Sequence, residues 1–206
     1  VDPDLLAGLE RSRAQVLALL DGDQGTIWEK LRTVLGRAKA LESSLFAEDF
    51  RRDFPFPPPP IPGLFRASAA WLLEVLAELD PLRPDWPELL KARAKQLSAL
   101  SPADYIALQA GYERANPRWE RQLANLACYF VFRHWHKAVN DDVLYGRAAF
   151  VCAACSVVYH LSLFQPGEEV TLWTRFSREV EHDENNLAEL IWALSEPDAL
   201  PPPLTF

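Results

Sequence analysis

A run of polar residues interrupts an apolar helical pattern near the end of the chain. Between Trp173 and Leu194 apolar residues recur at helical spacing, and the sequence Glu-His-Asp-Glu-Asn at positions 181–185 falls within this pattern. The spacing places Asp183 and Glu184 on the side that faces the core. A carboxylate there is costly unless it is paired, hydrogen-bonded or facing a cavity. The run therefore indicates either a polar site or a helix break at which Asp183 or Glu184 caps the next helix.

The same segment offers few ligands for a metal ion. Glu179 and His182 lie one helical turn apart, and His160 could approach from the preceding helix, but a motif such as His-Glu-x-x-His is absent from the sequence. His134 and His136 are two residues apart, so on a helix they point to different faces and make a poor chelate. We expect no metal site.

Two cysteines, Cys152 and Cys155, have the spacing of a redox or metal-binding pair. Their surroundings, FVCAACSVVYHL, are apolar, and cysteine in such a helix packs as a small hydrophobic residue. The apolar run 148–164 is shorter than the roughly 20 residues that a bilayer span needs, and it contains Ser156 and His160. We therefore predict a buried core helix and no membrane partner.

Composition and charge narrow the class of protein. The chain has 206 residues, of which 49% are hydrophobic, and this is enough apolar mass for one medium domain or two small helical ones. A net charge of −8 without a basic stripe argues against a nucleic-acid partner. Three cysteines without a spaced framework, and no signal peptide, favour a cytoplasmic protein.

Helical periodicity extends over almost the whole chain, and no alternating pattern predicts a strand. We predict an all-α fold, an irregular multi-helix bundle of about eight or nine helices. Six of the eight residues from Pro55 to Pro62 are proline, and they cannot be helical. The expected division is an N-terminal helical pair over 1–50, a proline-rich spacer over 51–63 and a C-terminal helical bundle over 64–206, unless all three form one compact domain.

Two segments of the chain resemble the end of the flagellin lysine-N-methylase family. In that family a segment of the type Glu-Asn-hydrophobic-Tyr-hydrophobic-Phe-Arg precedes a hydrophobic helix, and Ser-Arg-x-hydrophobic-Glu-His follows it. This chain has RQLANLACYFVFRHWHKAV at 121–139 and FSREVEHDENNLAEL at 176–190, with Ala124 where the family tends to have glutamate. The residues that fill the family's positions are Asn125, Tyr129, Phe130, Arg133, Ser177, Arg178, Glu181 and His182.

The resemblance implies an activity and cofactors that this chain alone does not account for. The family resembles S-adenosylmethionine-dependent methyltransferases that act on lysine ε-amino groups of bacterial flagellin, with a cysteine-rich N-terminal part expected to hold an iron–sulfur cluster. This chain has no cysteine before Cys128 and no methionine at which translation would start. We expect either the C-terminal fragment of such an enzyme or a relative that lost the chemistry, with no cofactor bound to this chain alone.

By resemblance, the site lies around the Ser-Arg-x-hydrophobic-Glu-His motif and binds a flagellin-like protein substrate. Glu181 would hold the lysine ammonium group, and His182 would accept its proton before methyl transfer. Arg178 lines the site or forms an intrahelical ion pair with Glu181. The further candidates for substrate binding are Asp183, Glu184, Asn125 and Arg133. The alternative is a noncatalytic helical module that binds a protein through its seven tryptophans and its proline-rich segment.

Overall fold

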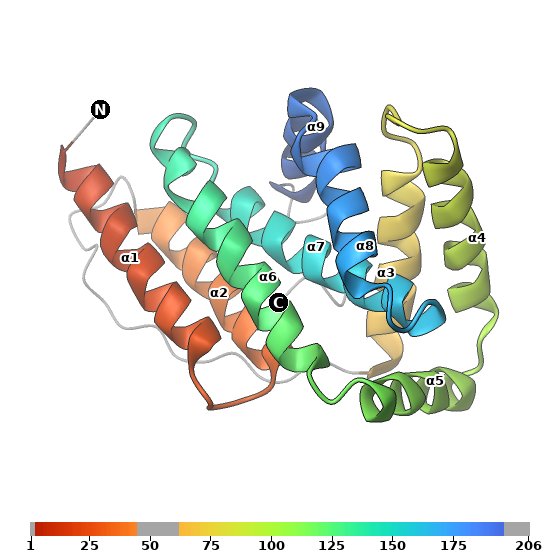
Figure 1. Cartoon of the computed structure of the whole chain (residues 1–206). Coiled ribbons are helices and arrows are strands. Elements are labelled where there is room, and N and C mark those ends of the chain that lie inside the picture. The colour runs from red at the N-terminus through yellow and green to blue at the C-terminus, as the bar shows by residue number, and fades with distance from the viewer. Residues whose placement is uncertain (1–2, 45–61, 196–206) are drawn as a thin grey trace. The chain divides into compact units, whose positions relative to one another are not determined.

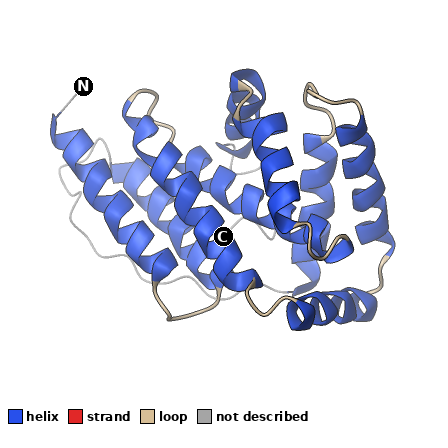
Figure 2. Ribbon diagram, in the orientation of Figure 1, coloured by secondary structure: helices blue, strands red, loops and turns tan. Residues whose placement is uncertain are grey.

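The computed structural model describes residues 3–44 and 62–195, and their regular structure is entirely helical (Figures 1 and 2). Nine α-helices and no strand lie in these ranges, which confirms the predicted all-α bundle. The α-helices are α1 (Pro3–Asp21), α2 (Ile27–Ser44), α3 (Pro62–Leu76), α4 (Asp85–Ala99), α5 (Pro102–Ala115), α6 (Trp119–His134), α7 (Leu144–Phe164), α8 (Glu169–Phe176) and α9 (Glu184–Ser195). A 3₁₀ turn, η1 (Trp135–Val139), follows α6, and a π-helical turn, η2 (Ser177–Glu181), follows α8.

The chain forms two compact units, and each combines two separate stretches of sequence. The first unit contains α1, α2, α6, η1 and α7 as far as Cys152, and the second contains α3 to α5, the rest of α7, α8, η2 and α9. This division differs from the expected one, because α6 and the start of α7 join the N-terminal helical pair. Two helices alone would leave much of their apolar surface in water, and further helices cover it. The expected spacer lies outside the described residues, apart from Pro62 and Gly63, which begin α3.

The first unit buries one side of α1 and ties it to the turn after α6. Leu9, Val16 and Leu20 recur at helical spacing and are fully or almost fully buried. On the same side the indole Nε1 of Trp135 donates a hydrogen bond to the Ser12 hydroxyl, 2.9 Å away. Both groups are buried, so this bond satisfies a polar indole N–H that the core would otherwise leave without a partner.

Helix α7 is the central apolar element of the sequence, and its burial is continuous. By length and composition it could cross a membrane, but every residue from Leu144 to Leu163 is buried within the protein. Cys152 and Cys155 are both inside, and burial raises the pKa of the Cys152 thiol to about 12. The predictions of a core helix and of cysteines that pack within it are confirmed.

His160 is a fully buried member of α7 in the second unit. Its Nδ1 lies 2.7 Å from the Ser156 carbonyl oxygen, and its Nε2 lies 2.9 Å from the Tyr105 hydroxyl. A carbonyl oxygen only accepts, so Nδ1 carries the proton of the neutral ring, and Nε2 accepts from Tyr105. Burial lowers the pKa of His160 to about 4 from its ordinary value of 6.5. Both ring nitrogens are occupied, so His160 is a structural residue.

The lowered pKa of His160 predicts acid sensitivity of the fold. Below about pH 6.5 the unfolded chain binds a proton at this ring, whereas the folded protein does not until about pH 4. Over this window the free energy of unfolding falls by about 3 kcal/mol on account of His160. Urea unfolding of the wild type and of His160→Gln from pH 7.5 to 4 measures this loss. We expect the variant to be less stable at neutral pH, and its unfolding free energy to depend less steeply on pH. The same pH dependence in both proteins would contradict the lowered pKa of His160.

Candidate functional site

The helical pattern between Trp173 and Leu194 is interrupted by a π-helical turn. Helix α8 ends at Phe176, and in η2 the His182 amide donates to the Ser177 carbonyl oxygen at 2.8 Å, five residues earlier. A π turn contains one residue more than an α-helical turn would accommodate, so it changes which side chains face inward. Such turns recur at functional sites.

The π turn places different carboxylates inside from those that uninterrupted helical spacing indicates. Glu179 and Glu181 have only 2% and 3% of their surface exposed. Glu184 is exposed and Asp183 is half-buried, so the expectation that these two face the core is wrong. The physical reason is the extra residue of η2 together with the break between Glu181 and Glu184.

The polar run after η2 caps the next helix. The Asp183 Oδ1 atom accepts hydrogen bonds from the backbone amides of Asn185 at 3.0 Å and Asn186 at 2.9 Å. These amides belong to the first turn of α9, where backbone N–H groups have no partner within the helix. The capping alternative that the sequence left open is confirmed for Asp183.

Two buried polar side chains connect this segment to the loop between α3 and α4. The Glu179 Oε2 atom accepts hydrogen bonds from the backbone amides of Leu82 at 2.8 Å and Arg83 at 3.3 Å. The Asn186 Nδ2 atom donates to the Asp80 carbonyl oxygen at 2.7 Å and to the Glu179 carbonyl oxygen at 2.9 Å. We call these four bonds the Glu179–Asn186 clamp. Three of them join segments about one hundred residues apart and fix the loop against η2 and α9, and the fourth joins α9 to η2.

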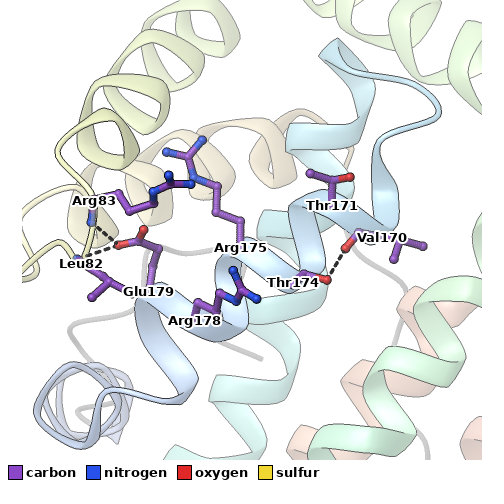
Figure 3. A pocket seen from close by; sticks show the side chains of 8 residues that line it. All are labelled: Leu82, Arg83, Val170, Thr171, Thr174, Arg175, Arg178 and Glu179. Carbon is purple, nitrogen blue, oxygen red and sulfur yellow. Dashed lines mark hydrogen bonds between the residues drawn. The ribbon is translucent and has the colours of Figure 1, made fainter.

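An open groove of about 730 Å³ lies beside the clamp (Figure 3). Helix α8 and η2 form one wall, and the α3–α4 loop forms the other. Three of the side chains that line it are arginines, and one is the buried carboxylate of the clamp. The lining residues are Leu82, Arg83, Val170, Thr171, Thr174, Arg175, Arg178 and Glu179.

The arginines of the groove differ in how they are paired. Arg175 lies 2.7 Å from the Asp85 carboxylate, and its guanidinium carbon is 5.1 Å from the centre of the Trp86 ring. Arg83 and Arg178 are exposed, and their side chains form no ion pair with the described residues. The second carboxylate oxygen of Glu179, Oε1, is buried and has no hydrogen-bond partner among the described residues. The neighbouring guanidinium groups supply the positive potential that makes a buried carboxylate tolerable.

This arrangement is suited to binding an anion. A guanidinium group presents several N–H donors in a plane that matches a carboxylate or a phosphate. The guanidinium groups of Arg83 and Arg178 are not engaged in ion pairs with described residues. Both side chains line the same groove, and they come from different elements (Figure 3). The clamp holds the backbone that carries Arg83, so a ligand does not have to order this backbone when it binds.

The structure distributes the predicted site residues over several environments. Arg178 lines the groove, Glu181 is buried, and His182 is exposed but does not line the groove. Asn125 and Arg133 are exposed on α6, in the first unit, where Arg133 donates to the Tyr129 hydroxyl at 3.2 Å.

Sequence reasoning did not select Arg83, Arg175 or Glu179 for the groove. Arg83 lies almost one hundred residues before the motif, and no pattern in the sequence links the two. Glu179 could have been found only by recognising that the motif forms a π turn.

The residues present do not fit the cofactors that the resemblance implies. An iron–sulfur cluster needs several convergent cysteine thiolates, but Cys152 and Cys155 are buried in α7, and burial raises the pKa of Cys128 as well. Among the described residues no three His, Cys, Asp or Glu side chains gather as metal ligands. The lining of the groove includes no aromatic ring against which the adenine of S-adenosylmethionine could stack.

The clamp predicts a large difference between two substitutions of Glu179. Glu179→Ala leaves the Leu82 and Arg83 amides without an acceptor and lowers the free energy of unfolding by about 2–4 kcal/mol. Glu179→Gln keeps an acceptor oxygen and costs about half as much. Urea unfolding and amide hydrogen exchange at Leu82 and Arg83 measure both effects. Glu189→Ala, an exposed substitution on α9, serves as control. Unchanged exchange in Glu179→Ala would refute the clamp.

Comparisons with known proteins add no relative to this description. No protein-family model matches the chain, and neither a curated protein nor a solved structure does. The assignment of the groove therefore depends on its own residues and geometry.

Proposed function

We propose that this chain is the C-terminal helical domain of a protein-lysine N-methyltransferase that acts on a flagellin-like substrate, and that its groove holds part of that substrate. The catalytic cofactors would belong to a cysteine-rich region outside this chain. The proposal combines the resemblance of two segments to the methylase family with the place of one of them in the fold. The Ser-Arg-x-hydrophobic-Glu-His motif occupies η2 and His182, at the edge of the groove.

The position of Arg178 is the observation that carries this proposal. It is the arginine of the motif, and its side chain lines the groove without an ion pair among the described residues. An intrahelical ion pair with Glu181, the alternative from the sequence, does not form, because Glu181 is buried while Arg178 is exposed. Arg178 is therefore available to contact a substrate.

The burial of Glu181 changes the role that we propose for it. A lysine ammonium group would have to enter the protein interior to reach a side chain that is 3% exposed. Glu181 is better suited to holding η2 in place, whereas exposed His182 remains the candidate proton acceptor. The two residues thus act separately in this proposal, one as a positioning residue and one at the surface.

A methyl-transfer assay on the complete gene product that contains this chain tests the proposal. The purified protein is incubated with tritiated S-adenosylmethionine and flagellin, and N-methyllysine is measured after acid hydrolysis, alongside iron and sulfide content. The proposal predicts labelled lysine. Arg178→Gln lowers kcat/KM by about 10-fold or more, the loss expected for one charge-assisted contact. Arg114→Gln, an exposed substitution on α5, leaves it unchanged. An iron-free product that transfers no methyl group would refute the proposal.

The second candidate is a noncatalytic helical protein-interaction module. The observation in its favour is the apolar rim of the groove, where Leu82 and Val170 are 69% and 70% exposed. Exposed apolar side chains beside free arginines are typical of surfaces that bind another protein. Under this alternative the groove binds its partner, but the complete gene product transfers no methyl group.

A further inference from the structure

We infer that the groove binds an acidic segment of a protein partner, with carboxylates on Arg83 and Arg178 and apolar side chains against Leu82 and Val170, which lie at opposite ends of the groove (Figure 3). Calling this partner a methyl acceptor rests on the proposed function, but the binding itself does not. The groove is open and about 730 Å³ in volume, so it can hold several residues of a peptide.

Charge complementarity selects the occupant. The groove is lined by three arginines and one carboxylate, that of Glu179, which accepts the Leu82 and Arg83 amides. Arg175 is engaged by Asp85, which lies outside the lining. Arg83 and Arg178 are left to bind a ligand's carboxylates, to which a guanidinium donates two parallel hydrogen bonds. A lysine side chain is not favoured here, because the arginines would repel its charge.

The arrangement of the groove favours an extended peptide over a small anion. In Figure 3 the side chains of Arg83 and Arg175 lie near Glu179, whereas Val170, Thr171 and Thr174 line a more distant part of the groove. A single phosphate or carboxylate would use only one end. The net charge of −8 opposes the long-range attraction that a nucleic acid would require. A peptide that combines acidic with apolar residues uses both the arginines and the exposed side chains of Leu82 and Val170.

Positioning of the loop strengthens the inference. The Leu82 and Arg83 amides are fixed by the buried Glu179 carboxylate, and the preceding Asp80 carbonyl oxygen accepts from Asn186. Binding therefore does not have to order the backbone of this wall, and the entropic cost of association is lower. The buried polar groups of the clamp make the groove a preformed feature of the fold.

Selection from a displayed library of random peptides tests the inference on the wild-type chain. A selected peptide is then synthesised with a fluorescent label, and its Kd is measured by anisotropy at 50 and 200 mM salt. We expect selected peptides to be enriched in Asp and Glu together with apolar residues, and Kd to rise at the higher salt. The double variant Arg83→Gln/Arg178→Gln should weaken binding at least 10-fold. The control Arg114→Gln/Arg118→Gln removes the same charge from exposed positions outside the groove and should have no effect.

Three outcomes would overturn the inference. The selected peptides could lack acidic enrichment, or the two double variants could lose the same amount of peptide affinity. In the third, millimolar phosphate at constant ionic strength displaces the peptide fully, and the peptides show no preference for apolar residues. The last outcome would mean a simple anion site. Because no methyl transfer is measured, failure here leaves the proposed activity to its own assay. Conversely, peptide binding in a protein without methyl transfer would retain this inference and favour the interaction module.

Discussion

The buried carboxylate of Glu179 is the constraint on which the rest of the site depends. It is almost completely enclosed, and it accepts two backbone amides of a loop that lies almost one hundred residues earlier in the sequence. Burying a charge is unfavourable unless hydrogen bonds and opposite charges compensate for it. The loop amides and the arginines of the groove provide that compensation. In return the carboxylate fixes the backbone of one wall of the groove, the wall that carries Arg83.

The π turn explains why this carboxylate is inside. Ordinary helical spacing over 173–194 predicts Asp183 and Glu184 on the inner side, where a carboxylate is costly unless it is paired or hydrogen-bonded. The extra residue of η2 instead turns Glu179 and Glu181 inward, and Asp183 caps α9. Whether a helix contains a π turn depends on tertiary contacts such as those of Asn186 with Asp80, and periodicity alone contains no information about them.

The fold could be predicted from the sequence more fully than the site. Apolar spacing predicts the all-α class, and the apolar run around Cys152 and Cys155 predicts the buried helix α7. The division into units was not predictable in the same way, because α6 joins α1 and α2 through contacts between distant segments. The site shows the same limit, since Arg178 was selected from the resemblance whereas Arg83 comes from a loop that no motif marks. Local pattern thus predicts elements, and long-range hydrogen bonds determine which of their side chains meet.

A double-mutant cycle between Glu179→Ala and Asn186→Ala tests most directly whether the clamp acts as one unit. Either substitution releases the Asp80–Arg83 loop, so the second should cost less once the first has been made. We predict that the loss in unfolding free energy of the double variant is smaller than the sum of the single losses by about 1 kcal/mol or more. Additive losses would mean that the two side chains act independently, and would contradict the account of a loop held by a shared clamp.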